Sequence, residues 1–224
     1  MSPGGSRAVA LLSGGLDSCV GLAMAVAVHG PRVAVLHAGY GQRTAARELE
    51  SALAIADHYD VEIRRTLDLT WLGDMGGSSL TDTDLPVPDA AGADGVPTTY
   101  VPFRNATLLA AAVAWAEVLG AGEIYCGLHA ADSAYPDTQP AFLTAFNELV
   151  RQGTPETTRI EVRAPLIDLD KAAILRRGQE LGAPLHLTWS CYQRQDRPCR
   201  RCHSCFLRAR GFAAAGLTDP LEAL

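Results

Sequence analysis

The chain has 224 residues, a formal net charge of −6 and six cysteines. This length suits one large domain with a small appendage, and the acidic balance argues against an extensive nucleic-acid surface. No apolar run approaches the ~20 residues of a membrane span, and no signal peptide is visible. We therefore expect a cytoplasmic protein whose clustered cysteines bind a metal instead of forming disulfides.

Apolar segments alternate with helical patterns along the chain, which predicts an α/β fold with a doubly wound, mostly parallel five-stranded sheet. The expected strands are residues 8–12, 33–37, 61–69, 123–128 and 159–162. Helices are expected at residues 19–28, 44–58 and 105–119. Because ligands bind beyond the carboxyl ends of parallel strands, the segments that follow these strands are the candidate site.

A glycine-rich turn with the sequence Ser-Gly-Gly-Leu-Asp-Ser follows the first expected strand, at residues 13–18. A strand, a glycine turn and a helix in this order point backbone N–H groups and a helix dipole at one anion. Ser13 and Ser18 can add hydroxyl donors, while Asp17 either caps the helix or helps to place Mg²⁺. The turn resembles the SGGxDS loop of the PP-loop ATP pyrophosphatases; the alternative is an ordinary turn before a capped helix.

Residues 73–100 interrupt the alternation of strands and helices. They are rich in Gly, Asp, Pro, Ser and Thr, and they are too long for an ordinary connection. This composition is typical of a mobile flap or of a disordered insertion, and we favour a flap because the segment leads directly into residues 101–105. We expect an α/β domain over residues 1–185 and a C-terminal subdomain over residues 186–224.

Four cysteines near the C-terminus have the spacing of metal ligands. Cys191, Cys199, Cys202 and Cys205 are separated by gaps of seven, two and two residues. Four thiolates can close a tetrahedral Zn²⁺ site with no open position, which indicates a structural ion. An iron–sulfur cluster is the main alternative, and a redox Cys-x-x-Cys pair is a third. Arginines surround these cysteines and either neutralise the thiolates or hold an anionic ligand or RNA; we favour neutralisation with a share in substrate binding. They are Arg194, Arg197, Arg200, Arg201, Arg208 and Arg210.

The chain has eighteen arginines and only one lysine, Lys171. A lone ammonium in such a background suggests a contact with phosphate, although a solvated side chain in the first turn of a helix is the alternative. Arg104 is a candidate clamp for a phosphate or a carboxylate, or else an ordinary arginine at a helix start. His37 and His129 follow strands, and we assign them no role.

Taken in order, these motifs resemble those of the 7-cyano-7-deazaguanine synthase family, a branch of the PP-loop ATP pyrophosphatases. The matching segments span nearly the whole chain. They are residues 13–18, Tyr-Gly-Gln-Arg at 40–43, Val-Pro-Phe-Arg-Asn at 101–105, Tyr-Pro-Asp at 135–137, Ala-Pro-Leu-Ile at 164–167, Lys171, Thr-Trp-Ser-Cys-Tyr at 188–192 and the cysteine block at 199–208. The resemblance implies an adenine nucleotide alpha-hydrolase-like fold, a homodimer, and ATP, Mg²⁺ and structural Zn²⁺ as cofactors.

The resemblance also implies a reaction. ATP would adenylate 7-carboxy-7-deazaguanine, ammonia would displace AMP to give an amide, and a second adenylation with loss of AMP would give the nitrile. The expected catalytic residues are Ser13, Asp17, Ser18, Arg104 and Lys171. ATP would lie on Leu12, Ser13, Gly14, Gly15, Leu16, Asp17, Ser18, Cys19, Val20, Gly21 and Leu22. The deazaguanine would contact Tyr40, Gln42, Arg43, Asp132, Tyr135 and Asp137, although the Tyr-Pro-Asp segment alternatively makes only a turn.

One departure leaves other functions open. The family usually continues Tyr-Pro-Asp with Cys-Arg, but Thr138 and Gln139 stand here. A related ligase could adenylate the same acid and join it to another amine, including one on a protein. A tRNA-modifying PP-loop enzyme is a second alternative, which the acidic balance disfavours. A nucleotide-binding sensor without catalysis is a third.

Overall fold

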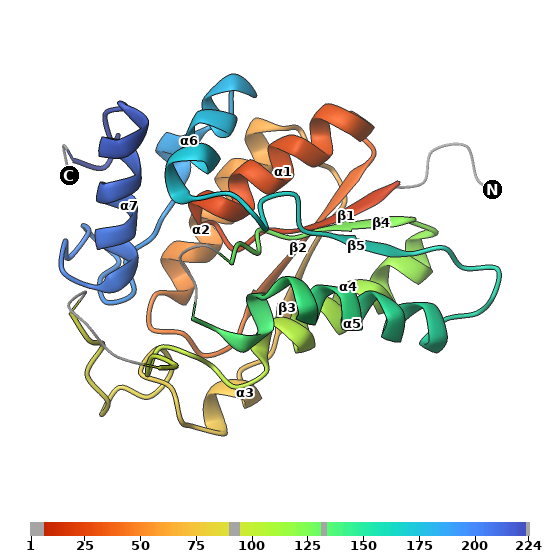
Figure 1. The fold of residues 1–224 in the computed structure, drawn as a ribbon, viewed down its shortest axis with the longest axis horizontal. Helices are drawn as coiled ribbons and strands as arrows, with labels where there is room; N and C mark the ends of the chain where they lie inside the picture. Colours follow the sequence, from red (N-terminus) through yellow and green to blue (C-terminus); the bar gives the residue numbers. More distant parts are fainter. Residues whose placement is uncertain (1–6, 90–94, 131–133, 223–224) are drawn as a thin grey trace.

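The protein is described by a computed structural model that covers residues 7–89, 95–130 and 134–222. Its centre is a five-stranded sheet in the order β3-β2-β1-β4-β5, in which all neighbours run parallel (Figure 1). The strands are β1 (Ala8–Leu11), β2 (Val33–Gly39), β3 (Arg64–Asp68), β4 (Glu123–Tyr125) and β5 (Glu161–Arg163). The predicted α/β class and the five parallel strands are confirmed. The chain order reverses between β1 and β4, which makes their carboxyl ends the switch point of the sheet.

Helices cover both faces of the sheet because the central strands β1 and β2 have apolar, buried residues on both sides. Val9 of β1 packs with α4 (Arg104–Leu119) and α5 (Pro140–Gly153). Ala8 and Ala10 pack on the opposite face, where α1 (Leu16–His29) and α2 (Ala45–His58) lie. The strand at the switch point is therefore buried from both sides, and it holds the turn that follows it in a fixed position.

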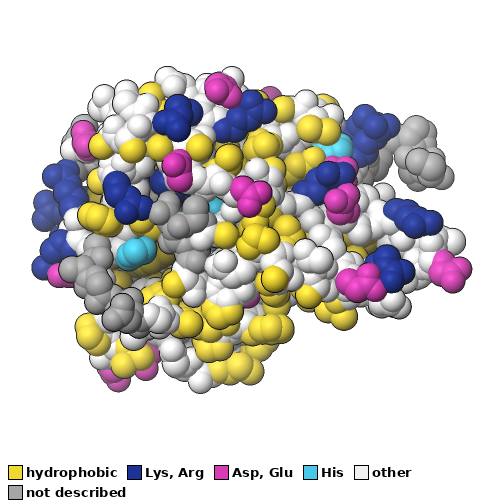
Figure 2. All heavy atoms as spheres, viewed as in Figure 1, with side chains coloured by type: hydrophobic (Ala, Val, Ile, Leu, Met, Phe, Trp, Pro, Cys, Tyr) yellow, Lys and Arg dark blue, Asp and Glu magenta, His cyan; other side chains and the backbone are white. Residues whose placement is uncertain are grey.

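Helices α6 (Lys171–Glu180) and α7 (His203–Ala215) complete the molecule next to α1. The shorter elements are α3 (Trp71–Asp74), η1 (Pro136–Thr138) and η2 (Leu185–Leu187). In Figure 2, basic side chains lie along the margin that α7 occupies in Figure 1. Within the described residues, no helix combines the length and apolar character needed to cross a bilayer.

Several boundaries differ from the sequence-based expectation. Helix α1 begins directly after the glycine turn, at Leu16 instead of residue 19, so the turn is shorter than expected. Strand β4 ends at Tyr125, and residues 126–128 line the site instead of extending the sheet. Helix α5 was not predicted. It begins at Pro140 and buries Phe146 and Val150, one turn apart, against the sheet.

The described part of residues 73–100 is packed against the body of the molecule, and the expected flap stays a prediction. Ser78 and Ser79 are completely buried. Val87 packs into the cluster that contains three of the C-terminal cysteines, and Asp89 forms an antiparallel bridge with Cys202. This segment therefore joins the sheet edge to the cysteine-bearing segment.

Candidate functional site

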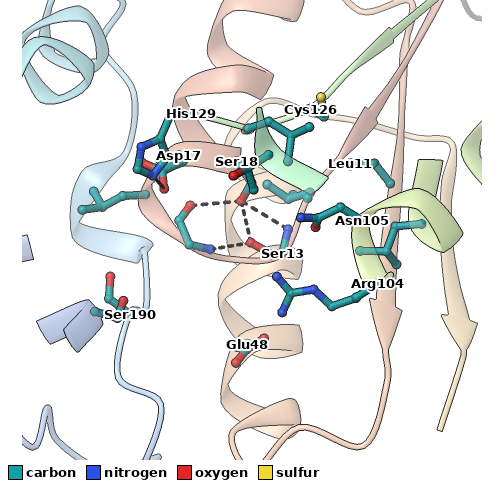
Figure 3. Close-up of a pocket in the computed structure, with 18 of the residues that line it drawn as sticks. Leu11, Ser13, Asp17, Ser18, Glu48, Arg104, Asn105, Cys126, His129 and Ser190 are labelled. Carbon is teal, nitrogen blue, oxygen red and sulfur yellow. Dashed lines mark hydrogen bonds and ion pairs between the residues drawn. The ribbon is translucent and has the colours of Figure 1, made fainter. Parts of the chain in front are cut away.

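A cavity of about 290 Å³ opens at the switch point, beyond the ends of β1, β2 and β4 (Figure 3). Its walls also include the first turns of α1 and α4 and parts of the C-terminal segment. Ten residues expected from the sequence line it together: Leu12, Ser13, Gly15, Leu16, Asp17, Ser18, Tyr40, Arg104, Tyr135 and Lys171. The tertiary structure thus brings the turn, both candidate cations and two of the tyrosines to one place.

The two serines of the turn shape its backbone. The Ser18 hydroxyl donates to the Gly15 carbonyl at 3.0 Å and accepts the Ser13 N–H at 3.2 Å. Because the only proton of that hydroxyl is used, the Ser13 hydroxyl must be the donor in the contact of 3.0 Å between them. The Ser13 oxygen in turn accepts the Gly15 N–H at 3.3 Å. These bonds hold residues 13–18 as a compact ring that includes the first residues of α1.

Only glycine fits at two close approaches around this ring. Gly14 has φ +88°, and a Cβ built there would lie 2.3 Å from the backbone carbonyl oxygen of Glu48. A Cβ on Gly127, after β4, would lie 2.8 Å from backbone atoms of Asp17 and Ser18. The turn is therefore pressed between α2 and the β4 loop without intervening side chains.

Asp17 pairs with Lys171 instead of capping the helix. The N-cap of α1 is Gly15, which makes no side-chain cap. The Lys171 ammonium donates to both Asp17 carboxylate oxygens, at 2.7 and 2.8 Å, and it is nearly buried, so the solvated alternative for this lysine is wrong. Burial disfavours the charged carboxylate, but Lys171 and His129 outweigh it and hold the pKa of Asp17 well below its usual range.

His129 belongs to this group, although no role was predicted for it. Its Nε2 lies 3.2 Å from the Lys171 ammonium and 3.3 Å from an Asp17 oxygen. The signal in the sequence was its position just after β4, at the switch point. That position alone did not distinguish it from a packed histidine.

Arg104 is the first residue of α4, and its guanidinium points toward Ser13 in Figure 3. Its Nη1 donates to the Tyr40 hydroxyl at 2.9 Å, and its Cζ lies 5.0 Å from the centre of the Tyr40 ring. Burial raises the pKa of Tyr40 to about 12, with Arg104 acting in the opposite direction. Tyr40 is therefore a neutral phenol that supports a permanent cation at the cavity wall.

Three residues expected to bind substrate make internal contacts and do not line the cavity. Gln42 accepts the Tyr40 N–H at 2.8 Å. Arg43 donates to the carbonyls of Ser79 and Asp82, at 2.8 and 2.6 Å. Gln42 thus supports Tyr40, and Arg43 holds the segment after α3.

The third of these residues, Asp137, accepts the backbone N–H of Asn105 at 2.9 Å and the side-chain amide of Asn105 at 3.1 Å. These bonds brace the first turn of α4. Asp132 lies outside the described residues. Within the predicted ATP segment, Cys19, Val20 and Leu22 face the core, as their near-zero exposure shows. They and Gly21 support the turn from below the cavity wall.

The C-terminal segment supplies part of the wall, which the sequence analysis missed. The backbone N–H of Trp189 donates to the Gly14 carbonyl at 2.9 Å, so this segment is hydrogen-bonded directly to the turn. Ser190, Tyr192 and Arg208 line the cavity. Their contribution depends on a long-range contact between the two ends of the chain, which no local pattern reports.

The four C-terminal cysteines form a cluster that could hold a metal. Their sulfur atoms all lie within 4.8 Å of one another, and those of Cys199 and Cys205 are 3.9 Å apart. A tetrahedral Zn²⁺ site requires sulfur separations of about 3.8 Å. Thiol donors from Cys202 and Cys205 lower the pKa of Cys191, and the Cys199 N–H also donates to its sulfur at 3.3 Å. These donors favour a thiolate there.

Comparisons with known proteins agree with this geometry. A family described as "Queuosine biosynthesis protein QueC" matches residues 7–216. A 7-cyano-7-deazaguanine synthase of Chlorobaculum parvum is 50% identical over 219 residues, covering 96% of each chain. One of Koribacter versatilis is 50% identical over 219 residues and covers 96% of this chain and 92% of its own. A solved 4-thiouridine synthetase–RNA complex with bound ATP aligns with a TM-score of 0.52 at 20% identity, over 96% of this chain and 52% of its own, which shows a shared fold.

Proposed function

Because this chain belongs to the queuosine biosynthesis protein QueC family, we propose that it converts 7-carboxy-7-deazaguanine, ammonia and ATP into 7-cyano-7-deazaguanine. The observation that carries the proposal is the cavity at the switch point. There the glycine turn meets the buried Lys171 ammonium and the partly buried Arg104 guanidinium. Such a cavity suits two anions that must react with each other, a nucleotide and an organic acid.

The reaction balances as two adenylations. A carboxylate oxygen of the acid attacks the α-phosphorus of ATP, and the bond to the β-phosphate oxygen breaks with release of pyrophosphate. Ammonia adds to the acyl carbon, and AMP and a proton leave to give the amide. The amide oxygen then attacks the α-phosphorus of a second ATP, with release of pyrophosphate and a proton, and loss of AMP and a second proton yields the nitrile. Positioning and charge neutralisation are the main demands of such phosphoryl chemistry.

We assign the positioning of the reactants and the neutralisation of their charge to residues of the cavity. The backbone N–H of Gly14, in the turn shaped by Ser13 and Ser18, would help to hold the phosphates of ATP bound as its Mg²⁺ complex. Lys171 would neutralise phosphate charge, with Asp17 and His129 holding its ammonium at the turn.

Arg104, on the other side of the turn, would bind the substrate carboxylate. Tyr40 supports that guanidinium, and Tyr135 lines the same wall, with its hydroxyl 2.7 Å from that of Thr99. The adenylated acid would thereby form between two fixed cations, with the turn below it.

The cysteine cluster fits a structural Zn²⁺. Cys191, Cys199, Cys202 and Cys205 would hold the ion with four sulfur ligands, and it would stabilise the C-terminal segment without a position for substrate. Metal analysis and the absence of colour would distinguish zinc from an iron–sulfur cluster. The homodimer and the division at residue 185 remain predictions, which light scattering and limited proteolysis test.

Mass spectrometry of the products tests the proposed reaction. Purified protein is incubated with 7-carboxy-7-deazaguanine, ATP, Mg²⁺ and ammonium, and we expect the nitrile together with AMP and pyrophosphate. Release of ADP and orthophosphate would contradict the assigned position of attack. A product that stops at the amide, or that carries another amine, would contradict the nitrile as the end point.

A further inference from the structure

Arg208 of α7 is a buried cation at the cavity. Nearly all hydrogen bonds of its guanidinium go to groups in the core of the protein. Its side chain is only 4% exposed. Nε and Nη2 donate to the Asp219 carboxylate at 2.8 Å each, which neutralises the charge within the core. The remaining nitrogen, Nη1, donates to two hydroxyls, those of Thr188 at 2.9 Å and Ser190 at 3.2 Å.

The hydroxyls of Thr188 and Ser190 differ in the acceptor that is available for their own protons. The Thr188 hydroxyl donates to the Leu185 carbonyl at 2.7 Å, and Thr188 is completely buried. Ser190 lines the cavity, and among the described residues no acceptor is recorded for its proton. A guanidinium has donors only, so the Ser190 oxygen must accept from Arg208 and its O–H must point elsewhere. The open direction is the cavity.

Ser190 also lies at the right place for a phosphate. The preceding residue, Trp189, donates its N–H to the Gly14 carbonyl at 2.9 Å, which ties this segment to the turn. In Figure 3, Ser190 and Arg104 lie on opposite sides of the turn. A nucleotide phosphate held on the turn would therefore have the Ser190 hydroxyl on the side away from Arg104.

We propose that Ser190 is a nucleotide-binding residue that donates its hydroxyl proton to a phosphate oxygen of ATP, and that Arg208 is the positioning residue that orients it. The inference rests on the nucleotide part of the proposed function. It deepens the site by adding a donor from the C-terminal segment to those of the turn. A hydroxyl already polarised by a cation is a stronger donor than an isolated serine.

Calorimetric titration with Mg²⁺ and an ATP analogue that has a methylene group between its α and β phosphorus atoms tests this. We expect Ser190→Ala to bind the analogue about tenfold more weakly, with a nearly unchanged thermal midpoint, and Ser190→Thr to restore binding. Thr188→Val is the matched control because it removes the other hydroxyl that Arg208 contacts. It should lower the thermal midpoint while the dissociation constant stays within about twofold of wild type.

Several results would overturn the proposal. These are wild-type affinity in Ser190→Ala, an unfolded Ser190→Ala, or equal losses of stability and affinity in Ser190→Ala and Thr188→Val. Arg208→Lys should weaken binding in the wild-type background but not further in Ser190→Ala; equal losses in both backgrounds, or an unfolded Arg208→Lys, would contradict the positioning role. Because the titration needs no deazaguanine acid, a wild-type protein that binds the analogue but makes no nitrile would contradict only the proposed reaction. A wild-type protein that does not bind the analogue would contradict both.

Discussion

The Asp17–Lys171 pair places two opposite charges beside the glycine turn, and most of each side chain is shielded from water. Asp17 is 25% exposed and Lys171 is 9% exposed. In such a pair, each charge is tolerated because the other compensates for its lost hydration. Removing one partner should therefore affect stability as well as chemistry.

Lys171→Met should abolish AMP formation and lower the free energy of unfolding by about 2–3 kcal/mol, because Asp17 is left without its counter-ion. Adding Asp17→Asn to this variant should restore part of the stability and none of the activity. Denaturant unfolding and an AMP assay on both variants check this. Stability losses that simply add in the double variant would show that the two charges do not compensate each other.

At the scale of the element, the start of α4 is determined by contacts with η1. Phe103, which precedes the helix, has φ +56° and is largely exposed, a conformation that costs energy for a non-glycine residue. Asp137 accepts two bonds from Asn105 and thereby holds the first turn against this strain. Arg104 enters the cavity from that turn.

Asp137→Ala should lower the free energy of unfolding by about 1–3 kcal/mol because it leaves the buried Asn105 N–H without its acceptor. Asp137→Asn keeps a carbonyl oxygen and should cost less. The Michaelis constant for the deazaguanine acid should change little in either variant. Unchanged stability with a raised constant for this acid would instead indicate that Asp137 contacts the substrate directly, as the sequence first suggested.

The cysteine-bearing segment connects the cysteine cluster to the turn. Trp189 packs in the same apolar cluster as Cys191, Cys202 and Cys205, and its N–H bonds to the Gly14 carbonyl. Loss of order in this segment would therefore remove a support of the turn.

Cys202→Ser should lose bound metal, unfold at a lower temperature, and bind the ATP analogue more weakly than wild type. Metal analysis, thermal unfolding and calorimetry check the three effects. Cys19→Ala is the control, because Cys19 is buried in the main core outside the cluster, and this variant should keep its metal. A metal-free Cys202→Ser with wild-type stability and affinity would refute the link.

At the scale of the whole molecule, a cluster of charged side chains around Glu123 stabilises the amino-terminal end of the sheet, away from the cavity. Glu123, at the start of β4, accepts from the Tyr125 hydroxyl at 2.9 Å and pairs with His29 and Arg163 at 3.0 Å each. Burial opposes its charge, but Tyr125, His29 and Arg163 together lower the pKa of Glu123. This group joins the end of α1 to β4 and β5.

A lowered pKa in the folded protein means that the Glu123 contribution is present above its unfolded pKa of about 4.3 and is lost as the pH falls through the folded value. Wild type should therefore be more stable than Glu123→Gln at pH 7, and the difference should shrink as the pH falls below the unfolded pKa of about 4.3 and through the lower folded value. Denaturant midpoints across this range measure it, with AMP formation at pH 7 unchanged as the control. A difference that persists at low pH would exclude this ion-pair origin.

The sequence by itself determined the α/β class, the position of the glycine turn and the four clustered cysteines that could hold a metal, because each is encoded in contiguous residues or a short spacing. It also identified Lys171 and Arg104 from composition and neighbouring motif. Only the tertiary structure decided that Asp17 pairs with Lys171, and that His129, Ser190 and Arg208 join the site while Arg43 and Asp137 brace the fold. Those roles depend on which distant segments meet at the carboxyl edge of the sheet. A local sequence pattern looks the same whether a side chain faces a cavity or a neighbouring backbone. The role of such a side chain is therefore decided by the packing of distant segments.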